Sequence, residues 1–197
     1  MFAQTQNELH NMKHMSILAV SLLALVACTP EKKQEADYSQ YVNPMIGTDF
    51  TGNTYPGAQV PFGMVQLSPD NGLPGWDRIS GYFYPDTTIA GFSHTHLSGT
   101  GAGDLYDISF MPVTRPYKEA PAPLGIYSTF SHNDEAASAG YYRVLLKDYN
   151  INVELTATER CGIQRYTFPE AEASVFLNLK KAMNWDFTLD SKIEVVD

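Results

Sequence analysis

The sequence predicts an all-β protein with an antiparallel β-sandwich fold, and three observations support this class. Short runs with apolar residues at alternating positions recur along the chain, turn-forming groups separate them, and no long segment has the period of an amphipathic helix. The chain has 197 residues, 44% of them hydrophobic and only 18% charged, which indicates a globular protein able to bury one sizeable core.

The clearest strands are expected at 142–146 and 151–155, where apolar residues occupy every second position. Further strands are predicted, in chain order, at 63–67, 89–96, 108–113, 127–131, 163–168 and 175–180. Groups such as Asp70-Asn71-Gly72 and Glu159-Arg160-Cys161-Gly162 form the turns between them. A last strand-like run with Ile193, Val195 and Val196 stops at Asp197, so we expect a sandwich that is incomplete at its C-terminal end.

The first 27 residues predict a lipoprotein signal peptide. Residues 15–26 are almost all apolar and follow Lys13, and this run is too short to span a bilayer. It ends in Leu25-Val26-Ala27-Cys28, which resembles a bacterial lipobox, so Cys28 is the expected acylation site. Residues 28–40 are predicted to be a flexible tether and residues 41–197 the partial β-sandwich domain. A buried helix at 15–26 is the less favoured alternative. The protein is therefore expected to be an exported bacterial lipoprotein of the periplasm or the outer-membrane surface.

Charge and cysteine content narrow the function classes further. The 13 Lys and Arg residues against 22 Asp and Glu residues give a net charge of −9, which disfavours binding to nucleic acid. Acylation of Cys28 leaves Cys161 as the one other cysteine, so an intramolecular disulfide is not expected. Cys161 is predicted to be a small core residue rather than a nucleophile.

An aromatic residue beside an acid in GWDRISGYFYPD indicates a candidate carbohydrate site. A sugar presents C–H faces together with hydroxyl edges, so its binding site combines a flat ring with a polar group. Trp76 followed by Asp77 supplies this pair. The alternative, equally weighted from the sequence, is that Trp76 belongs to the core.

The segment GFSHTHLSGTGAGDLYD contains a second candidate. In an extended strand His94 and His96 point to the same face, where they could meet a metal or substrate hydroxyls, with Asp104 and Asp107 as carboxylate partners. A zinc site needs a third protein ligand that the sequence does not specify, so histidines with structural hydrogen bonds are the favoured interpretation. The glycine-rich run from Gly99 lacks the features of a phosphate-binding loop and is interpreted as a turn beside a site.

Several motifs in fixed order carry a resemblance to a known family. The order NPMIGT, YPGAQVPFGMVQLSPD, GWD with SGY, GFSHTHLSGTGAGD, and VELTATER with RYTFP, over residues 41–179, resembles the N-terminal β-sandwich domain of glycoside hydrolase family 92. Members of this family are exo-acting, calcium-dependent α-mannosidases. The resemblance implies inverting hydrolysis of terminal α-linked mannose, commonly α-1,2, on N-glycans or mannan.

The resemblance also implies a division of roles. In the family, the acid, the base and most calcium ligands lie in a C-terminal (α/α) barrel, so we expect no catalytic residue and no metal ligand in this chain. Calcium is expected as the cofactor of the full-length family member. The residues expected to contact or support a mannose-containing glycan are Trp76, Asp77, His94, His96, Ser98 and Gly99.

Two functions from different classes follow. The first is a fragment of a secreted, lipid-anchored exo-α-mannosidase, which lends sugar-contacting loops to a catalytic barrel and is inert alone. The second is a non-catalytic, carbohydrate-binding surface lipoprotein anchored through Cys28.

Overall fold

The computed structural model describes residues 36–99, 105–121, 124–179 and 188–196. The predicted signal peptide, with Cys28, and Asp104 lie outside these residues. The described residues from Tyr38 onward belong to one compact unit. Among the described residues, no helix has the length and apolar character needed to cross a membrane. The elements are η1 (Ser39–Tyr41), β1 (Ser68–Asp70), η2 (Trp76–Arg78), β2 (Thr88–Ile89), β3 (Gly91–Ser93), β4 (Ser109–Thr114), β5 (Ser128–Thr129), η3 (His132–Asp134), β6 (Glu135–Ser138), β7 (Tyr141–Leu146), β8 (Ile151–Ala157), β9 (Gly162–Thr167) and β10 (Ala173–Asn178), where η marks a 3-10 helix.

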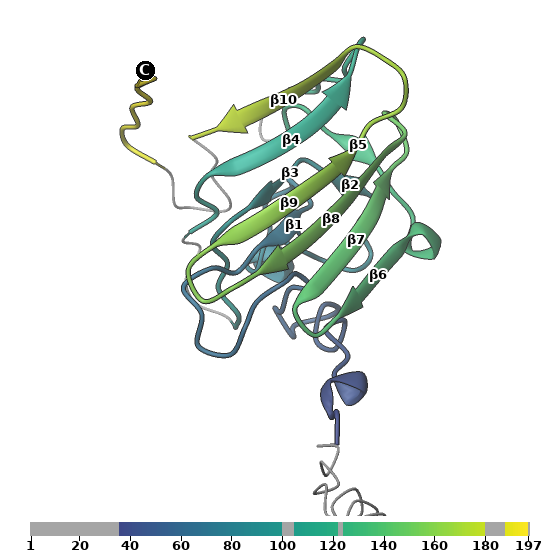
Figure 1. Ribbon diagram of the computed structural model, residues 1–197, viewed down its shortest axis with the longest axis vertical. Helices are drawn as coiled ribbons and strands as arrows, with labels where there is room; N and C mark the ends of the chain where they lie inside the picture. Colours follow the sequence, from purple (N-terminus) through teal and green to yellow (C-terminus); the bar gives the residue numbers. More distant parts are fainter. Residues whose placement is uncertain (1–35, 100–104, 122–123, 180–187, 197) are drawn as a thin grey trace, which may run out of the picture. The chain divides into compact units, whose positions relative to one another are not determined.

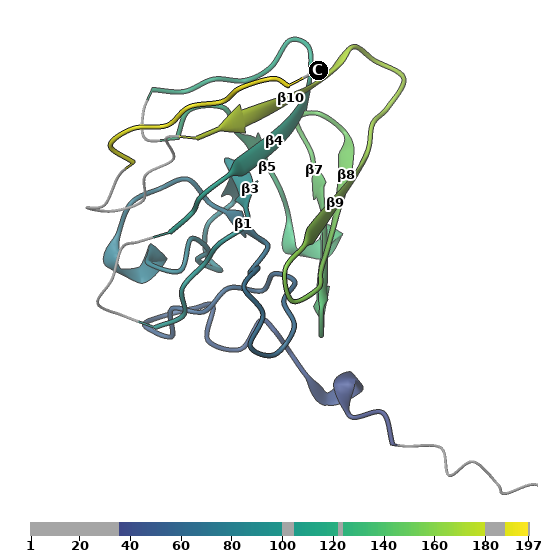
Figure 2. The same ribbon diagram turned by 60° about the vertical axis from the view of Figure 1, so that its left-hand side comes forward.

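Two four-stranded antiparallel sheets make up the sandwich. One has the strand order β1-β3-β4-β10 and the other β6-β7-β8-β9, while β2 and β5 form a separate short ladder. Figures 1 and 2 show the two sheets as facing layers. One continuous core joins them, with Phe92, Met111 and Val113 from the first sheet and Val144 and Val153 from the second. The predicted all-β sandwich is confirmed.

The apolar alternation read from the sequence decides which face of β7 and β8 is buried. Val144, Leu146, Ile151 and Val153 are buried, whereas Arg143 and the other intervening residues are half-buried or exposed. Each buried side chain of this size contributes about 1.5–3 kcal/mol to folding, so a one-residue slip in register would exchange the two faces at large cost.

Other strands differ from their predicted ranges. In the stretch 63–67, Leu67 alone makes a bridge, to Ala58, and the strand proper begins at Ser68. The stretch 89–96 contains two strands of different sheets, because β2 pairs with β5 whereas β3 pairs with β1 and β4, and β3 ends at Ser93. Strand β6 was not predicted, since its sequence Glu-Ala-Ala-Ser carries no apolar alternation. Residues 188–196 form no strand.

Cys161 is exposed, and its prediction as a core residue is wrong. It lies in the tight turn between β8 and β9, where its amide and carbonyl bond to Thr158 at 3.2 Å and 2.8 Å. The turn directs the side chain toward solvent because the alternation of the strand has already ended.

A buried acid anchors tyrosines of the sandwich. The Glu135 side chain is nearly inaccessible and accepts hydrogen bonds from the hydroxyls of Tyr82 and Tyr142. His132 Nδ1 lies 2.7 Å from the same carboxylate, and its Nε2 donates to the Tyr84 carbonyl at 2.7 Å. Burial, the charge of Glu135 and these hydrogen bonds raise the pKa of both Tyr82 and Tyr142.

This cluster predicts alkaline unfolding. Tyr82 and Tyr142 stay protonated in the folded state, whereas the unfolded chain ionises them near pH 10. Their contribution is therefore fully present below about pH 10 and is lost as the pH rises through the folded pKa values. Tyrosinate absorbance and circular dichroism, followed together above pH 10, should show these phenols ionising in one step with the loss of the fold. Complete ionisation of all tyrosines while the circular dichroism stays native would contradict this result.

Candidate functional site

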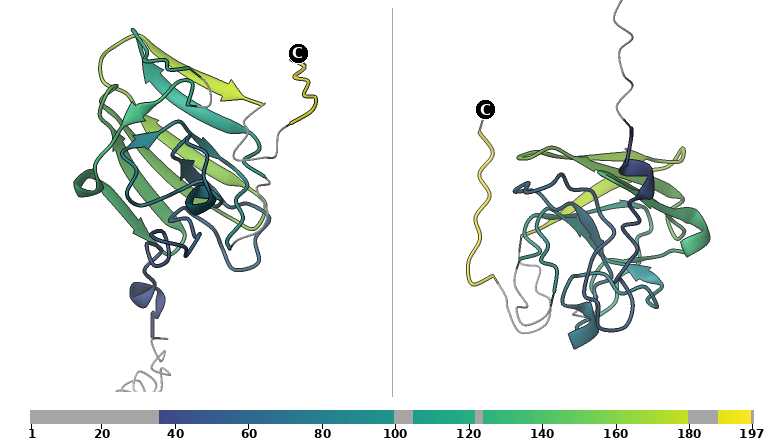
Figure 3. Two further views of the ribbon diagram at one scale, coloured as in Figure 1. Left: turned by 180° about the vertical axis from the view of Figure 1, so that it is seen from behind. Right: turned by 90° about the horizontal axis from the view of Figure 1, so that it is seen from below.

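Three loops gather on the side of the β1-β3-β4-β10 sheet that faces away from the other sheet. They comprise residues 43–55, 71–87 and the described part of 94–107 (Figure 3, left). The hydroxyl of Ser80 donates to the Thr54 carbonyl at 2.9 Å, and the amide of Gly99 donates to the Asn53 carbonyl at 2.8 Å. The second and third loops are thus tied to two adjacent residues of the first, Thr54 and Asn53 respectively.

The Trp76 loop presents its aromatic ring to solvent. Trp76 opens the short helix η2 and is 54% exposed, so it does not belong to the core. Asp77 follows it and is half-buried. Of the two interpretations of Trp76 that the sequence left open, the structure therefore favours a surface role beside an acid.

An ion pair closes the base of this loop. The Arg78 guanidinium forms two hydrogen bonds with the buried Asp86 carboxylate, one of them 2.6 Å from Nε to Oδ2. The guanidinium also lies over the Phe83 ring, 4.7 Å from its centroid. The hydrogen bond to Asp86 raises the pKa of Arg78. A bidentate pair fixes orientation as well as distance, so the chain around Trp76 is held in one conformation.

His96 lies beneath the loops rather than on their surface. It is 3% exposed, and its Nδ1 is 2.7 Å from the Gln66 carbonyl while its Nε2 is 2.8 Å from Asp70 Oδ1. The hydroxyl of Ser93 donates to the same carboxylate oxygen at 3.0 Å. Because a carbonyl only accepts, Nδ1 carries a proton and donates it to Gln66. Both ring nitrogens are thereby engaged within the protein.

The Trp76 loop packs directly on this buried pair through Gly81. Gly81 has a φ of +87°, in the region that favours glycine. A Cβ at this position would lie 2.9 Å from Asp70 Oδ1 and 3.1 Å from the ring of His96. Glycine is therefore required here on two grounds, and the loop that carries Trp76 rests against the His96–Asp70 pair.

His94 has a different environment from His96. Its Nδ1 is 3.0 Å from the Ile108 carbonyl, and its half-buried ring meets Phe110 edge-on and lies next to Gly162. The expectation that both histidines share one strand face is wrong, because β3 ends before either of them. Neither ring nitrogen of His96 remains available for a zinc ion.

The other candidate residues lie in the third loop. Ser98 is exposed, and Gly99 is half-buried with a φ of +97°. Burial raises the pKa of Tyr55 to about 12, although a hydrogen bond with Ser98 acts in the opposite direction. Asp107 is exposed and accepts from the Thr95 hydroxyl at 3.3 Å. Trp76, Asp77, Ser98 and Gly99 thus lie in the loops joined at Asn53 and Thr54. His94 opens the third loop but packs against Phe110.

The first loop contributes an acceptor that the sequence did not indicate. Asn53 is buried with a φ of 48°, and its side-chain oxygen has no hydrogen-bond partner among the described residues. A buried acceptor of this kind is uncommon, and it lies where the second and third loops meet. No group of three or more His, Cys, Asp or Glu side chains in the described part of the chain is placed to hold a metal ion.

Sequence reasoning also missed the residues that position the loops. Asn71 was assigned to a simple turn, but its side chain donates to the Thr88 carbonyl at 2.8 Å and accepts from the amide of Phe83. Asp70 and Asp86 were not singled out. Their roles depend on partners 26 and 8 residues away in the chain, and no local pattern signals such pairs.

Comparison with known proteins identifies the family. The sequence model of the glycosyl hydrolase family 92 N-terminal domain matches residues 41–197. The chain belongs to glycosyl hydrolase family 92. It is 26% identical over 172 residues to an uncharacterised secreted glycosidase of Arthroderma benhamiae, an alignment that covers 82% of this chain and 21% of that protein.

Solved structures of family 92 enzymes share the fold. The α-mannosidase BT3965 from Bacteroides thetaiotaomicron is 45% identical, with a TM-score of 0.68, over 73% of this chain and 20% of its own. The inverting mannosidase BT2199 from the same organism is 31% identical, with a TM-score of 0.59, over 74% of this chain and 20% of its own. The family 92 chain described here thus spans about a fifth of the length of these relatives.

Proposed function

We propose that this chain is the N-terminal domain of an exported exo-α-mannosidase and supplies the sugar-contacting loops of its active site. The match of residues 41–197 to the family 92 N-terminal domain carries the proposal, together with 45% identity to the α-mannosidase BT3965. The description of the Arthroderma benhamiae relative as secreted supports export. The substrate is terminal α-linked mannose, with α-1,2 linkages in N-glycans or mannan as the proposed preference.

The residues of this chain bind and orient the sugar. The exposed Trp76 ring offers a flat face to the C–H groups of a pyranose, and Asp77 beside it accepts hydrogen bonds from hydroxyls. Ser98 and Gly99 lie in the neighbouring loop. The geometry favours a positioning role for His96, which holds the loops from below through Asp70.

The proton transfers are assigned to the C-terminal region of the full-length enzyme. Inversion requires an acid that protonates the leaving oxygen and a base that activates water on the opposite face, about 6.5–9.5 Å apart. We assign neither role to Asp77 or Asp107. Calcium, when bound, would take oxygen ligands mostly from that same region and would hold the hydroxyls of the mannose ring.

Transplanting the aligned segment tests this proposal. Residues 41–197 should replace their counterparts in BT3965 and yield a chimera that releases mannose from an α-1,2-mannobiose, whereas the 197-residue chain alone releases none. In the chimera, Trp76→Ala should lower kcat/KM at least about tenfold, because a stacked ring is lost. The matched control is Phe62→Ala, which removes a fully exposed aromatic ring and should change little. Turnover by the isolated chain, or equal kinetics for the two variants, would contradict the proposal.

The second candidate function is a carbohydrate-binding lipoprotein without hydrolysis. The exposed Trp76 beside Asp77 fits it equally well, since binding alone needs no further residues. An inactive but folded chimera that still binds mannose would favour this function over the first.

Anchoring through a lipid on Cys28 is part of the proposal. The support is the sequence Leu25-Val26-Ala27-Cys28 after the apolar run. Expression in a bacterium with labelled palmitate should give a labelled protein, and Cys28→Ala should abolish the label. Equal labelling of the two proteins would rule out Cys28 as the anchor.

A further inference from the structure

We propose that the outer face of the β6-β7-β8-β9 sheet carries a second saccharide-binding site, centred on Arg143 and separate from the loops around Trp76. The inference rests on the proposed function, because it concerns how the same kind of glycan is held. Figure 1 views this face directly, and no other described segment lies in front of it.

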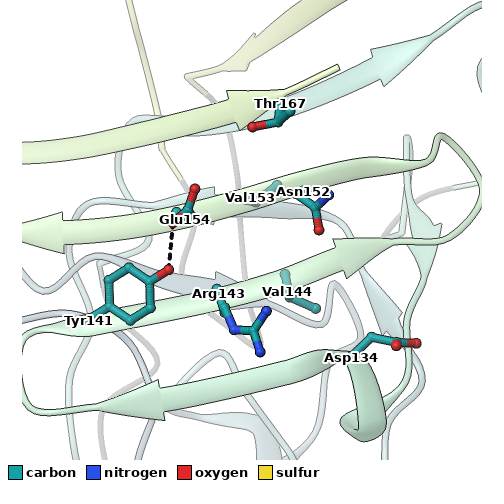
Figure 4. A pocket seen from close by; sticks show the side chains of 8 residues that line it. All are labelled: Asp134, Tyr141, Arg143, Val144, Asn152, Val153, Glu154 and Thr167. Carbon is teal, nitrogen blue, oxygen red and sulfur yellow. Dashed lines mark hydrogen bonds between the residues drawn. The ribbon is translucent and has the colours of Figure 1, made fainter. Parts of the chain in front are cut away.

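The site is a hollow of about 480 Å³ on the outward side of the sheet. Figure 4 shows the Tyr141 hydroxyl directed at Glu154 on the neighbouring strand, with Arg143, Asn152 and Thr167 on the strands around them. Its volume is within the range of small-molecule sites. Three strands and the end of η3 line it, with the residues Asp134, Tyr141, Arg143, Val144, Asn152, Val153, Glu154 and Thr167.

Strand register places the polar groups of the hollow side by side. Arg143 on β7 pairs with Glu154 on β8, and Asn152 on β8 pairs with Thr167 on β9. Arg143 and Asn152 are therefore diagonal neighbours on one face, about 7–8 Å apart between their backbones. This spacing suits a pyranose ring, whose hydroxyls can reach both side chains at once.

Part of the hollow is already fixed by internal bonds. Glu154 accepts a hydrogen bond from the Tyr141 hydroxyl at 2.6 Å and two from the Arg165 guanidinium at 2.6 Å each. The hydrogen bonds from Tyr141 and Arg165 lower the pKa of the Glu154 carboxyl. Tyr141 is thereby held in place, and its ring forms a preorganised wall.

Three further polar side chains of the hollow are not hydrogen-bonded within the described part of the chain, although the charge of Arg143 helps to lower the pKa of Glu154. Among the described residues, Arg143, Asn152 and Thr167 make no side-chain hydrogen bond or ion pair, and all three are exposed. The Arg143 guanidinium offers charged N–H donors, the Asn152 amide can both donate and accept, and the Thr167 hydroxyl can do the same. Such a mixture beside a fixed tyrosine matches the hydroxyls and C–H faces of a saccharide.

The net charge of the chain favours a neutral saccharide over an anion. In the hollow, Glu154 is paired with Arg165, and the Asp134 carboxylate lies 3.6 Å from Lys147 Nζ. Among the described residues, Arg143 is therefore the one unpaired charge of the lining, but the chain as a whole carries a net charge of −9. This net charge disfavours a phosphorylated or sulfated ligand, whereas hydroxyls can bond to groups of either charge. The ligand is therefore an uncharged oligosaccharide, and on the proposed function its units are α-linked mannose.

Affinity electrophoresis of the 197-residue chain in gels containing soluble yeast mannan tests the site. The wild-type chain should be retarded, and Arg143→Ala should weaken binding about tenfold, because a charged hydrogen bond is lost. Asn152→Ala should weaken it less. The matched control is Arg160→Ala, which removes the same charge from the exposed turn between β8 and β9 and should bind as the wild type does. Thermal unfolding midpoints show whether each variant is folded.

Trp76→Ala separates this site from the loops. Mannan retardation that persists in Trp76→Ala and disappears in the double variant with Arg143→Ala supports two sites. Retardation lost in Trp76→Ala but unchanged in Arg143→Ala and Asn152→Ala overturns the second site and leaves the proposed function standing. Absence of retardation of the wild-type chain also overturns the second site. The proposed function is tested separately, by hydrolysis in the chimera. Binding to heparin that depends on Arg143 would overturn the assignment to a neutral saccharide.

Discussion

The buried contact between His96 and Asp70 is the constraint on which the candidate site depends. It joins the end of β1 to the segment that follows β3, and the Gln66 carbonyl and Ser93 complete its hydrogen bonds. Removing one partner of a buried pair typically costs about 3–5 kcal/mol, because the other is left uncompensated. Gly81 packs against both side chains, so the loop that carries Trp76 takes its position from this pair.

On the proposed function, the same arrangement explains how this chain holds a sugar-contacting loop in place. The core of two sheets fixes the framework, and the hydrogen bonds at Asn53 and Thr54 join the loops above it. Trp76 is left exposed on a loop held by the Arg78–Asp86 pair. A rigidly held aromatic ring loses little entropy when a sugar stacks on it. The chain is thus suited to orienting a substrate whose chemistry is assigned to the rest of a family 92 enzyme.

Sequence reasoning predicted the parts of this structure that depend on local pattern. The alternation at Val144, Ile151 and Val153 predicted both the strands and their buried face. Successive side chains of a strand point to opposite faces, so apolar residues at every second position mark the buried one. Cys161 and the two histidines were assigned differently from what the structure shows, since each lies in a turn or loop outside a strand, where alternation no longer holds. The pairs His96–Asp70 and Arg78–Asp86 depend on tertiary contacts and leave no signal in a single sequence. Arg143 was read only as a polar position, and its hollow depends on strand register.

Backbone amide hydrogen exchange in Asp70→Ala tests the central claim most directly, with Asp107→Ala as an exposed aspartate control from the same loop cluster. The amides of Asn71, Gly81 and Gly99 bond within or between the loops. If the buried pair holds these loops, their exchange should accelerate at least about tenfold in Asp70→Ala, while Val153 in the sheet stays protected. Equal exchange in the two variants, with the loop amides still protected, would contradict the account.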